Sequence, residues 1–207
     1  MSLFITFEGG EGSGKTTVLN MINKALIEKG YQTVLTREPG GTPISEQIRD
    51  VILDKDNTAM DARTEAFLYA ASRRQHLVEK IWPSLKEGKL VLCDRYLDSS
   101  LAYQGVARGL GIDEILNLNM YATEGSFPDI TLFFDIEPEQ GLARIAKNNN
   151  REVNRLDLEK MSFHHQVRNA FLTLAKRYPN RYRIIDASKP LEDVFNQALE
   201  VILKELK

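Results

Sequence analysis

An α/β fold, with a parallel sheet covered by helices on both faces, is the fold class that the sequence predicts. Five short runs are continuously apolar and rich in β-branched residues, which is typical of strands buried on both faces. Helical patterns separate these runs along the chain, and such alternation favours parallel pairing. Ligands of such sheets bind beyond the carboxyl ends of the strands, so we expect the site there. The expected strands are Leu3–Phe7, Tyr31–Thr36, Leu90–Cys93, Ile130–Phe134 and Tyr182–Ile185.

The first half of the chain supplies a helix after each of its first two strands. Val18–Glu28 has a helical pattern directly after the first strand and a glycine-rich turn. Arg37–Gly41 is expected to be a loop at the end of the second strand, because its proline and glycines oppose helix continuation. Ser45–Leu53 is expected to be helical, and Asp61–Leu85 forms a longer helix that ends or bends near Pro83.

The second half repeats the alternation after a polar and aromatic segment, Asp98–Gln104. Pro138–Ala146 is expected to be a helix that begins at a proline, as the geometry of a first helical turn permits. Leu156–Arg177 and Pro190–Leu206 are the last expected helices, and they flank the fifth strand. Between the last two strands, residues 147–155 form a polar, irregular and basic segment that we expect to be a loop.

The composition is that of a globular chain without an unusual charge. Its 207 residues, 43% of them hydrophobic, are expected to fold as one domain, 1–207. A formal net charge of -2 gives no basic field, which argues against a nucleic-acid polymer as partner. One cysteine, Cys93, excludes an internal disulfide and suits a reducing compartment. Because no signal segment or membrane-spanning run is recognisable, we expect a soluble cytoplasmic protein without a membrane partner.

The glycine-rich run from Gly9 to Thr17 lies between the first expected strand and the first expected helix. It fits the pattern G-x-x-x-x-G-K-[ST], the P-loop that wraps a nucleotide's phosphates in backbone N–H groups. Lys15 can reach the β- and γ-phosphates, and the Thr16 hydroxyl can ligate Mg²⁺. The sequence therefore predicts a three-layer α/β/α fold of the P-loop NTPase type. The residues expected to contact the nucleotide are Gly10, Glu11, Gly12, Ser13, Gly14, Lys15, Thr16 and Thr17.

A P-loop alone does not choose among switches, motors, transporters and kinases. The chain lacks the Asp-x-x-Gly switch of a GTPase, and Asn23-Lys24 is followed by Ala25-Leu26 rather than by a guanine-reading aspartate. Arginines instead follow the strands or lie in the basic loop, and guanidinium forks match phosphate oxygens. This distribution indicates that two phosphate groups are brought together. The arginines are Arg37, Arg49, Arg73, Arg95, Arg144, Arg151 and Arg155.

Several motifs, in one order along nearly the whole chain, resemble the thymidylate kinase family of nucleoside monophosphate kinases. The resemblance implies ATP as phosphoryl donor, dTMP as acceptor, dTDP as product for dTTP synthesis, Mg²⁺ as cofactor and a homodimer. The motifs are Phe7-Glu8-Gly9 leading into the P-loop, Thr36–Gly41, Asp94-Arg95-Tyr96, Ser99–Gln104 and Asn154–Asp157.

The resemblance also implies roles at the phosphoryl-transfer centre. Arg95 is expected to hold the dTMP phosphate, and Asp94 to organise Mg²⁺ together with Thr16. A physical argument agrees, because an acid and a base at a strand end beside the P-loop can hold a cation and an anion. Glu11 lies where the family directs a carboxylate at the deoxyribose 3′-hydroxyl.

For the base, Tyr69 and Arg73 are four residues apart and share a helix face. They are expected to stack on thymine and to hydrogen-bond its edge, although the family commonly has Phe at the stacking position. Tyr103 resembles the aromatic residue that crowds the sugar and disfavours ribose. The full set implied for dTMP is Glu11, Arg37, Glu38, Arg49, Tyr69, Arg73, Arg95, Ser100, Tyr103 and Gln104.

The basic loop resembles the family's LID, which closes over ATP, and we place it at about 144–156. Gly12 stands where one branch of the family has a P-loop arginine, so LID arginines are expected to take that role. Which of them dominates stays open, and so do two other functions: a kinase for another nucleoside monophosphate, and a nucleotide sensor without transfer. No chemistry is assigned to the histidines. The catalytic set is Lys15, Asp94, Arg95, Arg144, Arg151 and Arg155.

Overall fold

The computed structural model describes residues 2–147, 156 and 159–206. Five strands form one sheet in the order β2-β3-β1-β4-β5, and every neighbouring pair is parallel. The predicted five-stranded parallel sheet is therefore confirmed, with strand ends shifted by up to two residues. The strands are β1 (Phe4–Glu8), β2 (Thr33–Arg37), β3 (Leu90–Asp94), β4 (Ile130–Asp135) and β5 (Tyr182–Asp186).

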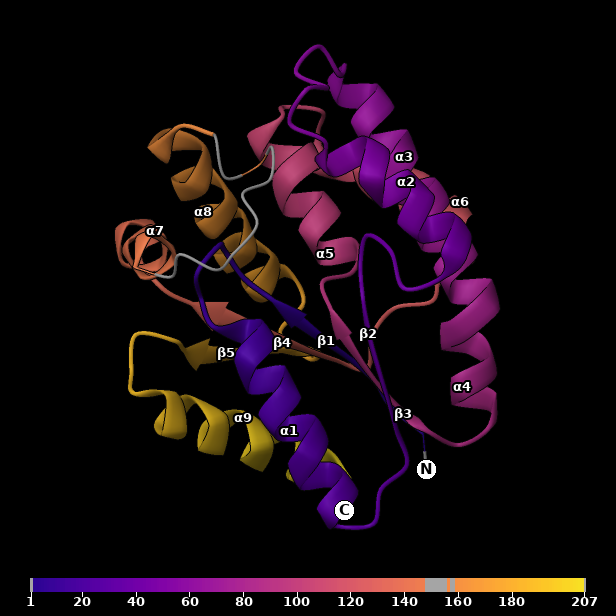
Figure 1. Cartoon of the computed structure of the whole chain (residues 1–207), viewed down its shortest axis with the longest axis vertical. Coiled ribbons are helices and arrows are strands. Elements are labelled where there is room, and N and C mark those ends of the chain that lie inside the picture. The colour runs from indigo at the N-terminus through magenta and orange to yellow at the C-terminus, as the bar shows by residue number, and fades with distance from the viewer. Residues whose placement is uncertain (1, 148–155, 157–158, 207) are drawn as a thin grey trace.

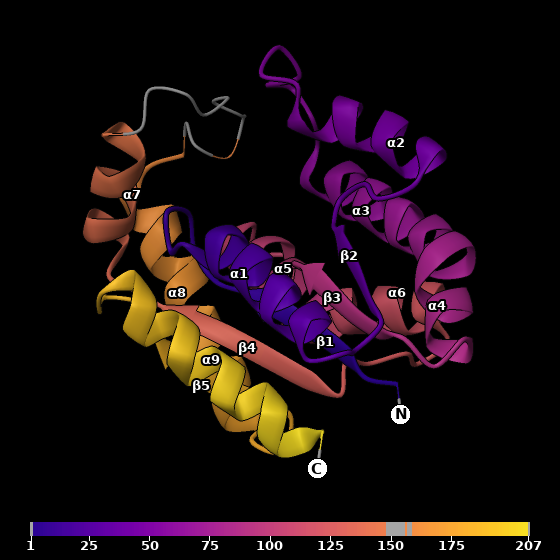
Figure 2. The same cartoon turned by 60° about the horizontal axis from the view of Figure 1, so that its bottom comes forward.

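Helices cover both faces of this sheet, because the strands are apolar on both sides. In β3, Leu92 belongs to the hydrophobic cluster of α1 (Lys15–Glu28) and α9 (Leu191–Glu205), whereas Cys93 belongs to the cluster of α8 (Met161–Arg177). Successive side chains of a strand point to opposite faces, so a continuous apolar run feeds two cores. Figure 2 shows α1 and α9 on one face and α8 on the other, which confirms the three layers.

The helices over the carboxyl ends of the strands lie in two groups. On one side, α2 (Pro43–Leu53) packs on α3 (Ala62–His76), and α7 (Pro138–Ala146) lies on the other side (Figure 1). Pro43 and Pro138 stand in the first turns of their helices, where the missing N–H has no intrahelical partner to lose. We therefore expect the functional site at the strand ends between these two groups of helices.

The long helix expected over Asp61–Leu85 is divided into three parts. Asp61 caps α3, and its carboxylate accepts from the backbone N–H groups of Arg63 and Thr64. A π-helical stretch, η1 (Leu77–Ile81), then leads into α4 (Trp82–Lys86). The widening occurs just before Pro83, whose ring cannot donate to the preceding turn.

In the second half, one segment had no expected secondary structure and one helix begins later than expected. The polar and aromatic segment is helical and buried, as α5 (Leu97–Ser100) and the π-helical η2 (Leu101–Ala107), and α6 (Ile112–Thr123) follows it. The helix expected from Leu156 begins at Met161, because the backbone of Lys160 is extended. No helix within the described ranges is both long and apolar enough to cross a membrane.

Candidate active site

The P-loop joins the carboxyl end of β1 to the first turn of α1. Helix α1 begins at Lys15, three residues before the expected Val18, so its free N–H groups face the loop. Gly12 has a φ of +71°, and a Cβ at this position would lie 2.0 Å from the carbonyl oxygen of Gly141. Only glycine fits there, because both the backbone conformation and the space exclude a side chain.

A cavity of about 330 Å³ lies against the loop and the start of α1, and we call it the phosphate cavity. It combines a helix N-terminus with two basic side chains, which is an anion-binding arrangement. Arg144 approaches it from α7, where its guanidinium also donates to the carbonyl oxygen of Ala187 at 2.9 Å. Arg151 and Arg155 lie outside the described residues. The lining residues are Gly12, Gly14, Lys15, Thr16, Thr17, Arg144 and Ile145.

A second cavity of about 300 Å³ opens beside the first, and we call it the acceptor cavity. All ten residues that the sequence assigned to dTMP line it, although they come from the P-loop, the end of β2, and α2, α3, β3, α5 and η2. Lys15 and Thr16 line both cavities, so the two sites meet at the start of α1. Asp94 lines it as well, and the residues that sequence reasoning missed are Pro39, Leu53, Tyr96, Ser99 and Leu156. Gly10 and Ser13 of the expected nucleotide set line neither of these two cavities.

Arg95 lines the acceptor cavity and is held against the P-loop. Its backbone has a φ of +69°, which turns the chain sharply after β3. The guanidinium donates to the carbonyl oxygen of Gly9 at 2.8 Å and to Oε1 of Glu11 at 2.9 Å. Tyr103 also donates its hydroxyl to Glu11, and its ring lies under the guanidinium at 5.1 Å. Arg95, Glu11 and Tyr103 therefore form one pre-organised group.

The charge on Glu11 is stabilised by this group. Burial raises the pKa of its carboxyl, but the nearby Arg95 guanidinium, the hydrogen bond from His164 and the charge of Lys15 lower it by more. The net effect places the pKa of Glu11 far below its ordinary value, so the side chain is an acceptor at neutral pH. Burial and Arg95 together lower the pKa of Lys15 to about 8.

The turn that carries Arg95 is fixed from below by Glu8, a residue that sequence reasoning gave no role. One carboxyl oxygen of Glu8 accepts the backbone N–H of Tyr96 at 2.8 Å, and the other accepts the Ser99 hydroxyl at 2.5 Å. Ser99 in turn accepts from Arg95 at 3.2 Å. Burial, followed by the charge of Asp98, raises the pKa of Glu8 to about 8.

Glu8 is expected to make the protein less stable as the pH rises. Because its pKa is 4.5 in the unfolded chain and about 8 in the fold, folding binds a proton between these values and stability falls through that window. The free energy of unfolding of Glu8→Gln, relative to that of the parent, should rise by up to about 1.4 kcal/mol per pH unit within this window. Above the window the difference should stay constant. Urea unfolding at pH 5, 7 and 9 measures this, with exposed Glu192→Gln as control. A pH-independent difference would contradict the assignment.

A hydroxyl and a carboxylate that both line the acceptor cavity converge at the start of α1. The Thr16 hydroxyl donates to Oδ2 of Asp94, which brings the start of α1 to the end of β3. Both groups offer oxygen ligands, which is the donor chemistry that Mg²⁺ prefers. The pair therefore fits the cation that accompanies a bound nucleotide.

The far end of the acceptor cavity is built around a buried guanidinium. Arg73 is 1% exposed, and its Nε donates to Glu38 at 2.7 Å. Its Nη1 donates to Ser100 at 3.0 Å and to Asn119 of α6. His76, which received no chemical role from the sequence, lies 3.0 Å from Glu38 and supports the same carboxylate. The network holds the Arg73 guanidinium in place and uses its Nε and Nη1, so Nη2 is left to donate to a ligand.

The other basic residues of this cavity lie nearer its mouth. Arg37 pairs with Glu46 at 2.8 Å, and Arg49 donates to the carbonyl oxygen of Pro39 at 2.9 Å. Tyr69 lines the cavity from α3, the same helix that supplies Arg73. The arrangement places positive charge at the mouth and an aromatic ring with a fixed guanidinium inside.

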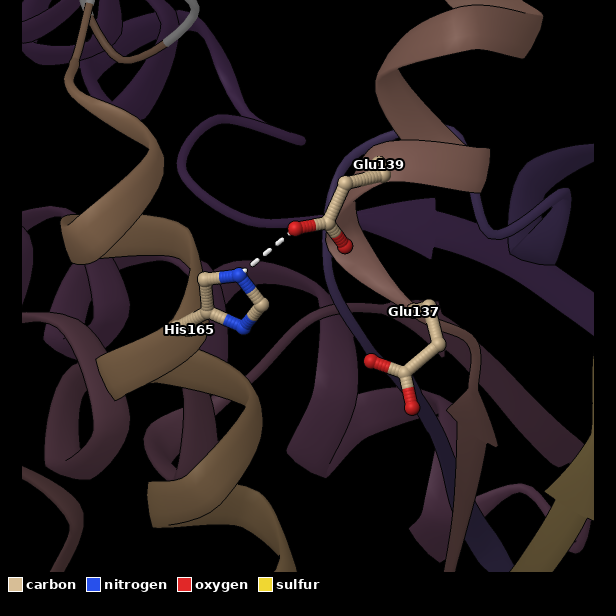
Figure 3. A group of neighbouring side chains, drawn as sticks. All are labelled: Glu137, Glu139 and His165. Atoms are coloured by element: carbon tan, nitrogen blue, oxygen red, sulfur yellow. Dashed lines mark hydrogen bonds and ion pairs between the residues drawn. The ribbon is translucent and has the colours of Figure 1, made fainter.

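One cluster of possible metal ligands lies away from both cavities. Glu137, Glu139 and His165 bring their ligand atoms within 4.8 Å of one another (Figure 3). His165 bonds Glu139 at 2.8 Å, and Arg168 pairs with Glu137 at 2.6 Å. A guanidinium already neutralises one carboxylate, and the two glutamates are exposed, so the cluster reads as surface ion pairs.

Comparisons with known proteins agree with this geometry over almost the entire chain. A family model described as thymidylate kinase matches residues 7–198. The thymidylate kinase of Clostridium novyi (strain NT) is 62% identical over 194 residues, covering 94% of this chain and 95% of that protein. That of Bacillus velezensis is 59% identical over 205 residues, covering 99% and 97%. The crystal structure of thymidylate kinase from Ehrlichia chaffeensis superposes with a TM-score of 0.81 at 33% identity, covering 97% of this chain and 98% of that one.

A phosphate loop that shares Lys15 and Thr16 with a second, basic cavity defines a P-loop protein of the kinase type. The motifs predicted the same class. With the family model and these relatives, the chain belongs to the thymidylate kinase family.

Proposed function

We propose that this chain transfers the γ-phosphoryl group of ATP to dTMP, giving dTDP and ADP for dTTP synthesis. The observation that carries the proposal is that one helix start, Lys15-Thr16, lines both the phosphate cavity and the acceptor cavity. Phosphoryl transfer requires the two phosphates to be aligned and their charge to be neutralised, and it requires little covalent chemistry from the protein. A protein that only sensed nucleotide would have no use for the second cavity.

In this mechanism, a phosphate oxygen of dTMP attacks the γ-phosphorus and forms the new P–O bond. The bond from the γ-phosphorus to the bridging oxygen breaks, and ADP leaves with the electron pair. Arg95 holds the acceptor phosphate in line, while Lys15 contacts the β- and γ-phosphates. Arg144, with Arg151 and Arg155 of the proposed LID at about 144–156, supplies positive charge to the transferring group.

Thr16 and Asp94 are the residues that would hold Mg²⁺ in this reaction. When bound, the cation would supply positive charge to the phosphates of ATP. The chain's own contribution is to keep the Thr16 hydroxyl beside the Asp94 carboxylate, through the pairing of β3 with β1. This keeps two oxygen ligands together at the start of α1.

The rest of the acceptor cavity accounts for the nucleoside. Tyr69 stacks on the thymine ring and Arg73 donates to its edge, with Ser100 and Gln104 as further polar contacts. Glu11 accepts the 3′-hydroxyl, and the Tyr103 ring crowds the position that a 2′-hydroxyl would take. Glu38 acts through Arg73, and Arg37 and Arg49 attract the phosphate at the mouth.

ADP release from ATP and Mg²⁺, measured separately with dTMP, dUMP, UMP, CMP and dGMP and with the product identified, tests the proposal. A clear preference for dTMP, with dTDP appearing, supports both reaction and base pocket. Preferred turnover of another monophosphate would replace the substrate, and tight ATP binding without transfer to any acceptor would favour the sensor.

We also propose that the chain forms a homodimer through an apolar face of α3 and α6. Phe67 is 60% exposed and Tyr121 is 89% exposed, and their two helices pack side by side. Val78 and Met120 are exposed nearby on the same helical layer. Large apolar side chains exposed on neighbouring helices are typical of interaction surfaces. We place the protein in the cytoplasm as a single domain, and without a nucleic-acid partner.

The dimer face predicts a change of mass for Tyr121→Lys. Burying a charged side chain in an apolar interface costs free energy because the charge loses its water. The variant should therefore be a monomer at concentrations where the parent is a dimer. Light scattering after size exclusion measures this. Ile27→Lys is the control, because Ile27 is 54% exposed on α1, on the opposite face of the sheet. A parent that is itself monomeric, or a dimeric Tyr121→Lys, would contradict the interface.

A further inference from the structure

The orientation of the Gln104 side-chain amide is set by a residue outside the acceptor cavity. Gln104 lines the cavity from η2, and its Nε2 donates to Oε1 of Glu65 at 2.7 Å. Glu65 belongs to α3, is 1% exposed, and is not among the residues that line the cavity. A carboxylate only accepts, so it can receive the amide nitrogen but not the amide oxygen.

Arg108 supplies a positive charge beside the Glu65 carboxylate. Its Nε lies 3.3 Å from Oε1 of Glu65 and its Nη2 lies 3.4 Å from Oε2. Arg108 also pairs with Glu159 at 2.7 Å, and its guanidinium stacks 4.8 Å from the ring centre of Phe163. A guanidinium stays protonated at all relevant pH values, so Glu65 has a permanent positive neighbour.

The cavity therefore presents a fixed order of hydrogen-bonding groups. With its nitrogen turned to Glu65, Gln104 has Oε1 left as an acceptor, and no described residue donates to it. Arg73 uses Nε and Nη1 on Glu38, Ser100 and Asn119, which leaves the Nη2 hydrogens as donors. The same cavity thus holds a donor on Arg73 and an acceptor on Gln104.

We propose that Glu65 is a specificity-determining positioning residue, which makes Gln104 present a carbonyl to the base and so selects pyrimidines that carry N3–H. Thymine and uracil offer a carbonyl oxygen to the donor of Arg73 and an N3–H to the acceptor of Gln104. Cytosine reverses both, because it has an amino group and an unprotonated N3. A site built for one pattern leaves its buried polar groups unpaired with the other. This inference rests on the proposed function.

The test compares the parent with Glu65→Gln, using kcat/KM for dTMP and for dCMP. A glutamine at 65 can offer either its oxygen or its nitrogen, so the Gln104 amide is free to flip. We expect the dTMP:dCMP preference to fall by about 10- to 100-fold, through a higher KM for dTMP and a faster reaction of dCMP, with kcat for dTMP changed less than about twofold. Dissociation constants for both nucleotides by calorimetry give the same ratio without turnover.

Two further variants separate this role from a structural one. Arg108→Lys keeps a positive charge beside Glu65 and leaves Glu65 facing Gln104, so the preference should be retained. Adding Gln104→Glu to Glu65→Gln places an acceptor-only side chain at 104 and should restore the preference for an N3–H base. An unchanged dTMP:dCMP ratio in folded Glu65→Gln, or no recovery in the double variant, would overturn the proposal. Failure of the parent to phosphorylate dTMP would instead sink the proposed function.

Discussion

Replacing Arg95 with alanine is expected to lower kcat for dTMP by about 10³- to 10⁵-fold while leaving the affinity for ATP within about twofold. Arg95 is proposed to hold the acceptor phosphate in line, and arginines that stabilise the transition state of related phosphoryl transfers contribute about that much. Arg95 lines the acceptor cavity beside the P-loop, where its guanidinium donates to Gly9, Ser99 and Glu11. Arg95 does not line the phosphate cavity, so we expect the proposed ATP site to be retained.

Two variants sharpen the Arg95 experiment. Arg95→Lys keeps the charge but loses the planar fork that matches phosphate oxygens, so we expect it to remain impaired by more than about tenfold. Arg183→Ala is the control for loss of an arginine. Arg183 lies on β5, pairs with Glu205 of α9 and lines neither of the two cavities. Steady-state rates with both nucleotides saturating, and calorimetric titration with ATP, measure the outcome. An Arg95→Ala enzyme within tenfold of the parent would refute the role of Arg95.

Removing the charge of Arg95 is also expected to change the pKa of Glu11 and the stability of the fold. The Glu11 carboxylate would keep its bond from Tyr103 but lose the nearest cation, and its pKa should rise from its lowered value. A combined Arg95→Ala and Glu11→Gln variant should therefore fold more stably than Arg95→Ala alone, while transfer stays lost. The comparison separates loss of folding from loss of catalysis.

The parts of the site that the sequence predicted are those encoded within a few residues. The P-loop is a contiguous run, and its pattern carries strand, turn and helix together, so Lys15 and Thr16 could be placed in advance. Tyr69 and Arg73 share a face because a helix sets their spacing. Arg95 was recognisable from its motif directly after a buried strand.

The parts that the sequence did not predict depend on which strands become neighbours. Glu8 fixes the Arg95 turn only because β1 pairs with β3, and 88 residues separate Glu8 from the Tyr96 N–H that it accepts. Asn119 binds Arg73 from α6, a helix that the sequence pattern did not reveal. The start of α8 also depends on the extended backbone of Lys160, which a hydrophobic pattern does not predict.

The same distinction explains why the contacts of buried His76 could not be predicted from the sequence. In the sequence, His76 is a single histidine in a helical segment, and no motif around it indicates a function. In the fold, its two ring nitrogens bridge Thr36 at 2.7 Å and Glu38 at 3.0 Å, so it links the end of β2 to the residue that aims Arg73. Its role is to support a charged network that long-range contacts assemble.

Arg73→Ala is expected to have the largest combined effect on stability and on dTMP affinity. Arg73 and Glu38 form a buried pair, and removing one member leaves the other charge without its partner at a cost of about 3–5 kcal/mol in the free energy of unfolding. The lost charged hydrogen bonds to the base should weaken dTMP binding by about 10- to 100-fold. Urea unfolding and calorimetric titration with dTMP measure the two effects separately.

The neighbouring Arg74 provides the matched control for this prediction. It lies on the same helix, but its pair with Glu124 is 41% and 65% exposed, so Arg74→Ala should change stability by no more than about 1 kcal/mol and leave dTMP affinity intact. Combining Arg73→Met with Glu38→Gln removes both buried charges and should recover much of the lost stability without restoring dTMP affinity. If a folded Arg73→Ala protein bound dTMP as tightly as the parent, Arg73 would be a structural residue only. Recovery of dTMP binding in the double variant would lead to the same conclusion, because neither substituted side chain can donate to the base as a guanidinium does.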